Sequence, residues 1–447
     1  MGRRPRKRRH RRAAAAAAEG PDCFSHLTED LLRSILNRLS TRFAARLAAV
    51  SRHFRREVPA LLERVDSLTL TEPAFEPSLP ETPPLLLRRL DIAPHRVMPA
   101  SAFRAVLNDA AQHGLSELGF RLVRRQRLPK NVLSVKSLVV LDLNTCAVPP
   151  WCEARCPCLR TLKLQRVAIH QDTINRILVS ASCLETLEME YCTGFGTGKD
   201  GGCTLVSPSV RYLVFRPTQK QAETAIRASG LRMVTLYTRG RAKKLELASA
   251  PEITKAYLHF AKSPRIMESF TVRPFLDAGV RLQCLKLGGH AMKILSSEYE
   301  EIPKLMVMFQ DLRILSVSVD LSNEQEPVFL LKLLESCPNL QKFTLSVAGK
   351  CSENNLPPSV DPTDRLASIS CLTSSLVQFK FRGFKPQEYQ KKLMGFLLTQ
   401  AMNLKMVHVE FEKNDLATVE EMLSVRTGTV QNKSTKYKKS YIQMDYS

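Results

Sequence analysis

The sequence predicts an α/β protein in which a small N-terminal unit of three helices precedes a long solenoid of parallel strands and helices. Two observations predict this architecture: a leucine spacing that recurs along most of the chain, and a sharply two-faced segment at residues 27–39. The 447 residues, 44% of them hydrophobic, suffice for two or three ordinary domains or for one elongated repeat array. No window approaches about eighteen consecutive apolar residues, so we expect no membrane-spanning helix.

The recurring spacing is L-x-x-L-x-L, with other apolar residues allowed at the leucine positions. The clearest copies are Leu138/Leu141/Leu143, Leu159/Leu162/Leu164, Leu184/Leu187/Met189, Leu282/Leu285/Leu287, Leu312/Leu315/Val317 and Leu340/Phe343/Leu345; looser copies are Val65/Leu68/Leu70, Leu87/Leu90/Ile92, Leu115/Leu118/Phe120, Val210/Leu213/Phe215, Leu231/Val234/Leu236 and Ile253/Ala256/Leu258. Successive copies lie 21 to 30 residues apart. This interval is typical of a leucine-rich repeat, whose L-x-L pair is a short strand with both apolar side chains in the core.

The stretches between the predicted strands indicate helices. In residues 172–180, Ile174, Ile177 and Leu178 fall at helical spacing. We therefore predict one strand and one helix per repeat over residues 65–375, with a parallel sheet on the concave face and helices on the convex face. The alternative is an irregular α/β domain, because any leucine-rich chain contains some L-x-x-L by chance.

No pattern in the sequence indicates catalysis, a cofactor or a metal. Twelve cysteines without a secretory signal predict free thiols in a reducing compartment. Cys146, Cys152, Cys156 and Cys158 lack the paired C-x2-C of a zinc site, and we interpret them as thiols of the repeat core. The glycine-rich residues 194–202 have Asp200 where a phosphate-binding loop needs Ser or Thr, so a flexible loop is expected there.

The charge of the chain is strongly basic, with a formal net charge of +23. A disordered arm is predicted at residues 1–22, and its basic residues Arg3, Arg4, Arg6, Lys7, Arg8 and Arg9 predict nuclear targeting, so we expect a nuclear or cytoplasmic protein. A transit peptide or a solubilising tail remains the alternative for this arm. Further basic clusters at residues 121–130 and 239–244 predict a solvated rim, with nucleic-acid contact as the alternative.

The two-faced segment predicts a helix over residues 29–39, with Thr28 as its N-cap. Its apolar side chains Leu31, Leu32, Ile35, Leu36 and Leu39 fall within an arc of about 140°. Two further short helices are predicted, over residues 43–50 and from residue 51 onward. Three helices in so short a unit make a very small core, so the unit is expected either to cap the solenoid or to bind another protein.

Residues 27–39, followed by Ala45-Arg-Leu-Ala-Ala-Val-Ser-Arg-His-Phe54, resemble an F-box in order and spacing. Thr28 and Ser40 stand where the family usually has proline, and Phe54 where tryptophan is common. The resemblance places the F-box at residues 23–64 and implies that it binds a Skp-type adaptor. The adaptor-binding residues implied are Leu27, Leu31, Leu32, Ile35, Leu36, Leu39, Val50 and Phe54; for Val50 and Phe54, packing within the three helices is the alternative.

An F-box followed by leucine-rich repeats resembles the plant-type F-box/LRR proteins, whose FBD region is echoed at residues 376–430, before a basic tail at 431–447. The resemblance implies a non-catalytic substrate receptor of an SCF-type ubiquitin ligase, linked through its adaptor to a cullin and binding an unknown protein target. Nucleic acid and membranes are not expected partners. The alternative function is a basic nuclear repeat protein that binds nucleic acid or acidic chromatin proteins. The target, a small-molecule co-ligand and the fate of the target are not determined by the sequence.

Overall fold

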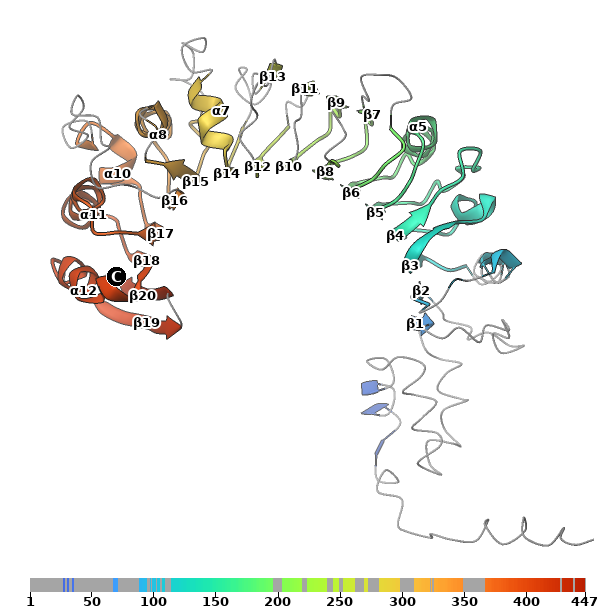
Figure 1. Cartoon of the computed structure of the whole chain (residues 1–447), viewed down its shortest axis with the longest axis horizontal. Helices are drawn as coiled ribbons and strands as arrows, with labels where there is room; N and C mark the ends of the chain where they lie inside the picture. Colours follow the sequence, from blue (N-terminus) through green and yellow to red (C-terminus); the bar gives the residue numbers. More distant parts are fainter. Residues whose placement is uncertain are drawn as a thin grey trace, which may run out of the picture.

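The fold is an arch of stacked repeats whose strands line the inner edge (Figure 1). The computed structural model describes residues 27–28, 30–31, 34–35, 67–70 and most of 88–446, with gaps at 95–96, 98, 102, 105–106, 109–113, 196–202, 219–222, 239–243, 249–251, 262–268, 272–280, 298–308, 322, 324, 349–365, 427 and 437–438. The predicted arm at residues 1–22 therefore lies outside the described residues.

One sheet of sixteen strands forms the concave side of the arch. Its parallel strands follow the chain: β1 (Ser67–Leu70), β2 (Arg89–Ile92), β3 (Glu117–Arg127), β4 (Val140–Ala147), β5 (Thr161–Gln165), β6 (Thr186–Glu190), β8 (Tyr212–Arg216), β10 (Met233–Thr238), β12 (Lys255–Phe260), β14 (Cys284–Gly289), β15 (Ile314–Asp320), β16 (Lys342–Ala348), β17 (Gln378–Phe384) and β18 (Met406–Glu412). Every L-x-L pair predicted from the leucine spacing lies in one of these strands, which confirms the repeats.

The strands stack in register because their leucines form continuous rows in the core. Leu162 pairs with Leu141 on one side and with Leu187 on the other, and all three are buried. The residue between two buried leucines is only partly buried in β5 and β6, so it faces the opposite side of the sheet. A shift of one residue would exchange these two faces, which is why the leucine pattern fixes the register.

Helices cover part of the convex side: α5 (Gln171–Ser180), α7 (Ala291–Ser297), α8 (Gln325–Glu335), α10 (Ser370–Ser374), α11 (Glu388–Gln400) and α12 (Leu416–Leu423), with short 3-10 turns η1 (Lys130–Leu133) and η4 (Lys413–Asp415). In α5 the predicted apolar face is confirmed, since Ile174, Ile177 and Leu178 are buried. Local hydrogen bonds hold the turn from β15 into α8: Asn323 Oδ1 accepts the N–H of Gln325, the first residue of the helix, and Glu326 accepts the Asp320 N–H of the strand.

The central repeats depart from the prediction of one helix per repeat. Their convex side is a second parallel sheet of short strands, β7 (Cys203–Val206), β9 (Glu223–Arg227), β11 (Lys244–Ala248) and β13 (Ser269–Thr271). The expectation of a helix in every repeat was therefore wrong here. The physical reason is that buried and exposed side chains alternate with a period of two, which is the period of a strand. In β7, Cys203 and Leu205 are buried while Thr204 and Val206 are exposed.

The C-terminal segment is also more ordered than a basic tail. Strand β17, helix α11 and strand β18 form the expected strand-helix-strand unit, and the chain then adds the antiparallel strands β19 (Thr429–Lys436) and β20 (Lys439–Asp445) to the edge of the sheet. Ile442 and Met444 of β20 are buried. Because these two residues alternate with polar ones, β20 adds a buried row to the core, and β19 forms the edge of the sheet.

Several repeats turn out of the concave strand through a left-handed residue. Thr145, Arg166 and Tyr191 have φ of 56°, 55° and 54°, and Gly289 and Gly383 adopt φ of 61° and 70° at the matching position. Only glycine takes this conformation without a steric penalty from Cβ. At Gly289 an added Cβ would also lie 2.1 Å from the Phe260 carbonyl oxygen, so the turn there requires glycine.

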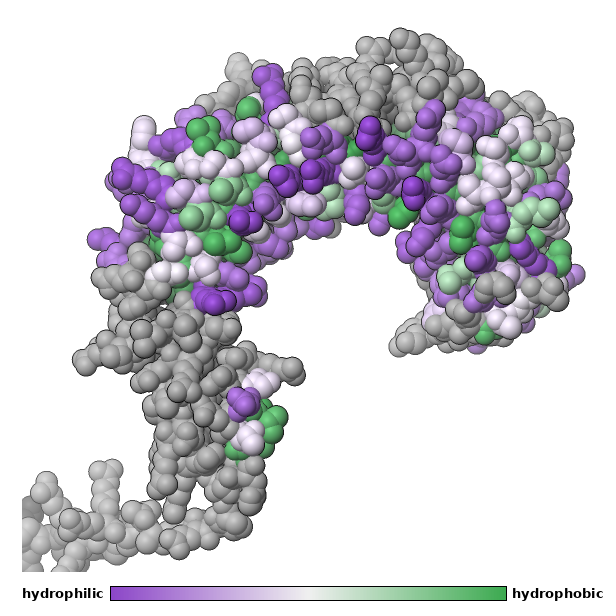
Figure 2. Space-filling model, turned by 180° about the vertical axis from the view of Figure 1, so that it is seen from behind, coloured by the Kyte–Doolittle hydropathy of each residue, from purple (hydrophilic) through white to green (hydrophobic). Residues whose placement is uncertain are grey.

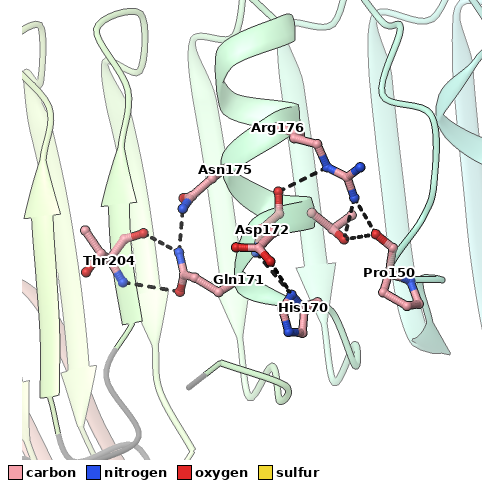
Figure 3. Close-up of polar contacts among 8 residues, drawn as sticks. Pro150, His170, Gln171, Asp172, Asn175, Arg176 and Thr204 are labelled. Carbon is pink, nitrogen blue, oxygen red and sulfur yellow. Dashed lines mark hydrogen bonds and ion pairs between the residues drawn. The ribbon is translucent and has the colours of Figure 1, made fainter. Parts of the chain in front are cut away.

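Helix α5 ties three consecutive repeats together through polar contacts (Figure 3). The Gln171 amide donates to the Thr204 carbonyl oxygen of β7 at 2.5 Å and to Asn175 Oδ1 at 3.0 Å, and the Thr204 N–H donates back to Gln171 Oε1 at 3.3 Å. The Arg176 guanidinium donates to the Pro150 carbonyl oxygen of the preceding repeat. These bonds join the first helical part of the convex side to the second sheet.

Candidate binding surfaces

The N-terminal helix has two exposed apolar side chains among its described residues. Asp30, Leu31, Ser34 and Ile35 are helical, and the exposed fractions of Leu31 and Ile35 are 54% and 36%. Leu27, just before the helix, is half-buried. Two large apolar side chains one turn apart on an exposed helix face are a common feature of helix-in-groove recognition.

The other residues predicted to act at the N-terminus cannot be placed. Leu32, Leu36, Leu39, Val50 and Phe54, together with the basic residues from Arg3 to Arg9, lie outside the described residues. The three-helix arrangement of residues 23–64 and the roles of these side chains therefore stay predictions.

The concave face is the second candidate surface, and it is largely polar. Figure 2 shows hydrophilic residues following the inner edge of the arch. The backbone pairing places the residues between the buried leucines in one row across the sheet: Asp91, Gly119, Asp142, Lys163, Glu188, Val214, Thr235, Tyr257, Lys286, Ser316, Thr344, Lys380 and His408. This row is varied because the core does not constrain it.

In the N-terminal third of this face, charges are paired within strand β2 and across adjacent strands. Ion pairs join Arg89 to Asp91 at 2.8 Å and to Glu117 at 3.8 Å, Arg121 to Asp142 at 3.8 Å, Lys163 to Glu188 at 3.0 Å, and Arg216 to Glu190 at 3.1 Å. Burial raises the pKa of Asp142, while Arg121 and Lys163 act in the opposite direction. This part of the face is therefore close to internal neutrality.

The centre of the face carries rings and cations in contact. The Tyr237 and His259 rings are stacked with centroids 4.5 Å apart, and the Arg216 guanidinium lies 5.6 Å from the Tyr237 ring. On the next row, Lys286 Nζ lies 4.5 Å from the Tyr257 ring. Burial, followed by the neighbouring His290, lowers the pKa of His259, which favours its neutral form at pH 7.

At the C-terminal end the charges are paired again. Glu410 lies 3.7 Å from Lys380 and 3.8 Å from Arg382, and His408 stacks on Tyr441 with centroids 5.3 Å apart. Burial, followed by Lys380, lowers the pKa of His408. At both ends of the concave face, carboxylates are therefore paired with cations of the fold itself.

Two surface hollows lie outside the concave face. One, of about 510 Å³, lies beside α5 and is lined by Trp151, which is 77% exposed, and by Val179, Arg155 and Arg176. The other, of about 600 Å³, is lined by Arg104, Arg127, Lys130 and Asn131. The second hollow is where part of the basic cluster at residues 121–130 lies, so this cluster is an exposed rim as predicted.

The cysteine sites are structural where they are buried. The ten described cysteines are free thiols; Cys146, Cys152 and Cys156 are buried, as predicted for core thiols, whereas Cys158 is exposed. Burial raises the pKa of Cys146 to about 12, which suppresses the nucleophilic thiolate. Within the described part of the chain no group of His, Cys, Asp or Glu could hold a metal ion, and no described helix is long and apolar enough to cross a membrane.

The repeats and the N-terminal segment each match the model of a known family. The family model for the At1g61320/AtMIF1 LRR domain matches residues 87–442, which is most of the chain. The chain belongs to this leucine-rich repeat family. The F-box domain model matches residues 24–58, which confirms the resemblance seen in the N-terminal sequence.

A curated relative of this F-box and leucine-rich repeat chain is the F-box protein At5g03100 of Arabidopsis thaliana. The two are 26% identical over 184 residues, which cover 39% of this chain and 58% of the relative. The chain thus matches little more than half the length of that relative. The family match at 87–442 also runs through the strand-helix-strand unit and into β20, so the repeats and the C-terminal strands belong to one family domain.

Several residues of the concave face were missed by the sequence reasoning. Next to the buried residues of β10, β12 and β14 lie the exposed Lys255 and Lys286 and the half-buried Tyr237, Tyr257 and His259. The signal that could have found them is their place in the L-x-x-L-x-L repeat, since each position between or beside the leucines faces the concave side. The sequence reasoning instead singled out basic residues that are adjacent in sequence, at residues 121–130 and 239–244; the second cluster lies almost wholly outside the described residues.

Proposed function

We propose that this chain is the substrate-recognition subunit of an SCF-type ubiquitin ligase. The F-box binds a Skp-type adaptor and, through it, a cullin, while the concave face of the repeats binds a target protein. The observation that carries the proposal is the F-box match at residues 24–58, joined in one chain to a repeat domain whose family match covers residues 87–442. F-box domains generally bind Skp-type adaptors, and F-box/LRR proteins are typically non-catalytic.

The physical role of such a subunit is tethering. Holding a target near a ubiquitin-charged enzyme raises the effective concentration of its lysines, and this requires binding surfaces rather than reactive groups on the receptor. The exposure of Leu31 and Ile35 supports the adaptor contact, because an apolar pair on an exposed helix face gains free energy when a partner covers it.

The proposal is tested with a pair of substitutions in the same helix. In Ile35→Asp, an adaptor-bound complex would bury an unpaired carboxylate, which costs several kcal/mol and should reduce adaptor affinity by at least about 100-fold. Ser34→Asp adds the same charge one residue away, on the polar face of the helix, and should leave adaptor binding nearly unchanged. The measurement is co-purification of a Skp-type adaptor with the full chain, followed by titration of purified components.

Folding is checked by circular dichroism and thermal unfolding of both variants. A folded Ile35→Asp chain that binds the adaptor as well as the unchanged chain would refute the adaptor contact. Equal loss in both variants would show that the carboxylate acts by general repulsion and not at an apolar contact.

We further propose that the arm directs the protein to the nucleus through Arg3, Arg4, Arg6, Lys7, Arg8 and Arg9. Replacing these six residues with alanine in a fluorescent fusion should shift the protein from nucleus to cytoplasm. An unchanged distribution would contradict the proposal, and loss of organelle import would support the transit-peptide alternative.

A further inference from the structure

The centre of the concave face differs from both ends in how its charges are paired. Toward the two ends, the concave carboxylates from Asp91 to Glu190, and Glu410 near the C-terminus, each lie within 4 Å of a lysine or arginine. On β12, β14 and β16, Lys255, Lys286 and Lys342 are exposed and form no ion pair with any carboxylate among the described residues. The centre therefore has positive charge that the described fold does not neutralise.

These three lysines lie on one side of the sheet because of the strand register. The pairing runs from Lys255 through Cys284 and Ile314 to Lys342 in one row, and from Tyr257 through Lys286 to Ser316 in the next row. In β12, β15 and β16 these positions alternate with buried residues of the core, and in β14 Lys286 is exposed between buried Leu285 and Leu287, whereas Cys284 is itself buried. The three lysines therefore face the concave side.

The spacing of the lysines matches that of an extended peptide. Neighbouring strands are about 4.8 Å apart, so the strand of Lys286 is about 5 Å and the strand of Lys342 about 14 Å from that of Lys255. A peptide in extended conformation, crossing these strands, presents a side chain to the sheet about every 6.7 Å. Three acidic residues at alternate positions would span about 13 Å and could reach all three lysines.

Rings and small side chains complete the surface. Tyr257 lies against Lys286, and Tyr237 and His259 stack beside it, so half-buried aromatic faces adjoin the lysines. Tyrosine offers both apolar contact and a hydroxyl to a peptide at low entropic cost. The small side chains of Ser316 and Thr344 in the same row leave room for a peptide backbone.

We propose that the lysine–tyrosine surface, defined as Tyr237, Lys255, Tyr257, His259, Lys286 and Lys342, binds an extended acidic peptide segment with carboxylates at alternate positions. This inference rests on the proposed function, because it takes the acidic segment to be part of the target protein. The opposite charges steer the encounter and set the register, and the rings supply contact area.

The distribution of acids favours a short acidic peptide over single-stranded nucleic acid. A nucleic-acid strand would also meet cations and rings, but it carries a charge at every nucleotide and extends in both directions. Glu188 and Glu190 on one side and Glu410 on the other flank the centre of the face. These carboxylates already occupy the cations beside them, so a long phosphate chain would find those cations already paired. A short acidic segment needs only the central strands.

The test uses the full chain and a fluorescein-labelled twelve-residue peptide with glutamate at alternate positions, measured by fluorescence anisotropy. We expect saturable binding that weakens with added salt, and no binding of the matched peptide with glutamine at those positions. The triple variant K255E/K286E/K342E should lose at least about tenfold in affinity, because three attractions become repulsions. Lys286→Glu and Lys136→Glu form a matched pair of single charge reversals, since Lys136 is exposed in a turn away from this surface and forms no ion pair among the described residues.

Two further arms separate this inference from the proposed function. Ile35→Asp should retain peptide binding, and the triple lysine variant should retain adaptor binding, so each contact can fail alone. Equal affinity for the glutamate and glutamine peptides, an equal loss in Lys136→Glu, or tighter binding of a single-stranded oligonucleotide than of the acidic peptide would overturn the inference. A triple variant that unfolds is replaced by Lys286→Gln and Lys342→Gln tested singly, where no loss in either would also overturn it.

Discussion

Gly289→Ala should destabilise the solenoid strongly, although it adds a single methyl group. Gly289 ends β14 with φ of 61°, and a Cβ there would lie 2.1 Å from the Phe260 carbonyl oxygen and 2.8 Å from its carbon. The left-handed conformation costs an alanine about 1 kcal/mol more than glycine. The Phe260 oxygen also accepts the His290 N–H at 2.8 Å, and moving it away weakens a bond that contributes about 1 kcal/mol.

The displacement of the backbone adds a further 1 to 2 kcal/mol, roughly the cost of overpacking a well-packed site. The expected loss is therefore about 3 to 4 kcal/mol of unfolding free energy. Gly395→Ala is the matched control, because Gly395 lies inside α11 and its added Cβ would meet nothing within 4 Å. This substitution should stabilise the chain by about 0.5 to 1 kcal/mol, because alanine loses less backbone entropy in a helix.

The assay is denaturant unfolding of both variants followed by far-UV circular dichroism, with hydrogen exchange to locate the change. Because repeats couple mainly to their neighbours, loss of protection in Gly289→Ala should be greatest in β12, β14 and α7. A Gly289→Ala chain as stable as the unchanged chain would refute the close approach at this turn. An equal loss in Gly395→Ala would show that the alanine acts through a feature common to both sites.

Three further outcomes follow from other parts of the structure. Among the described cysteines, alkylation of the native chain should be fast at the exposed Cys158 and Cys183 and slow at the rest, and mass spectrometry of the labelled sites checks this. Burial lowers the pKa of His259 in the folded chain, so its neutral form contributes stability above the ordinary histidine pKa of about 6.5, and this contribution is lost as the pH falls. In the variant His259→Gln, the unfolding free energy should therefore change less with pH in that range. Arg166→Gly should raise the unfolding free energy by about 0.5 kcal/mol, since Arg166 is exposed with φ of 55°; a loss of stability would contradict strain at that turn.

The concave strands could be predicted from the sequence because each needs only two buried residues at a fixed spacing. Even the loosest copy, Ile253/Ala256/Leu258, places its last two residues in β12, and Ala256 is fully buried between Val234 and Leu285 of the adjacent strands. The convex strands could not be predicted in the same way. In β9, five residues with Thr224 and Ile226 buried are too few to distinguish a period of two from a short helical turn.

The candidate surface was less predictable than the fold because its members are distant in sequence. Lys255 and Lys286 are 31 residues apart, and Lys342 follows 56 residues later. Each is one lysine among many in a basic chain, and only the stacking of repeats places them within four consecutive strands of the sheet. Basic residues adjacent in sequence, such as those at 121–130, are easy to recognise, but the fold separates them: Arg121 pairs with Asp142 on the concave face, and Arg127 and Lys130 line a hollow outside it.

The solenoid also fixes where a bound segment would lie relative to the N-terminal end. From β2 to β12 the sheet advances by seven strands, which is about 35 Å along the concave face. Because each repeat packs only on its neighbours, this separation is set by the number of repeats and not by any linker, so it does not fluctuate as it would in a flexible chain. If the acidic segment binds at the lysine–tyrosine surface, target lysines near that segment are held at a nearly fixed distance from the start of the arch. Moving the binding site by one repeat would shift them by only about 5 Å.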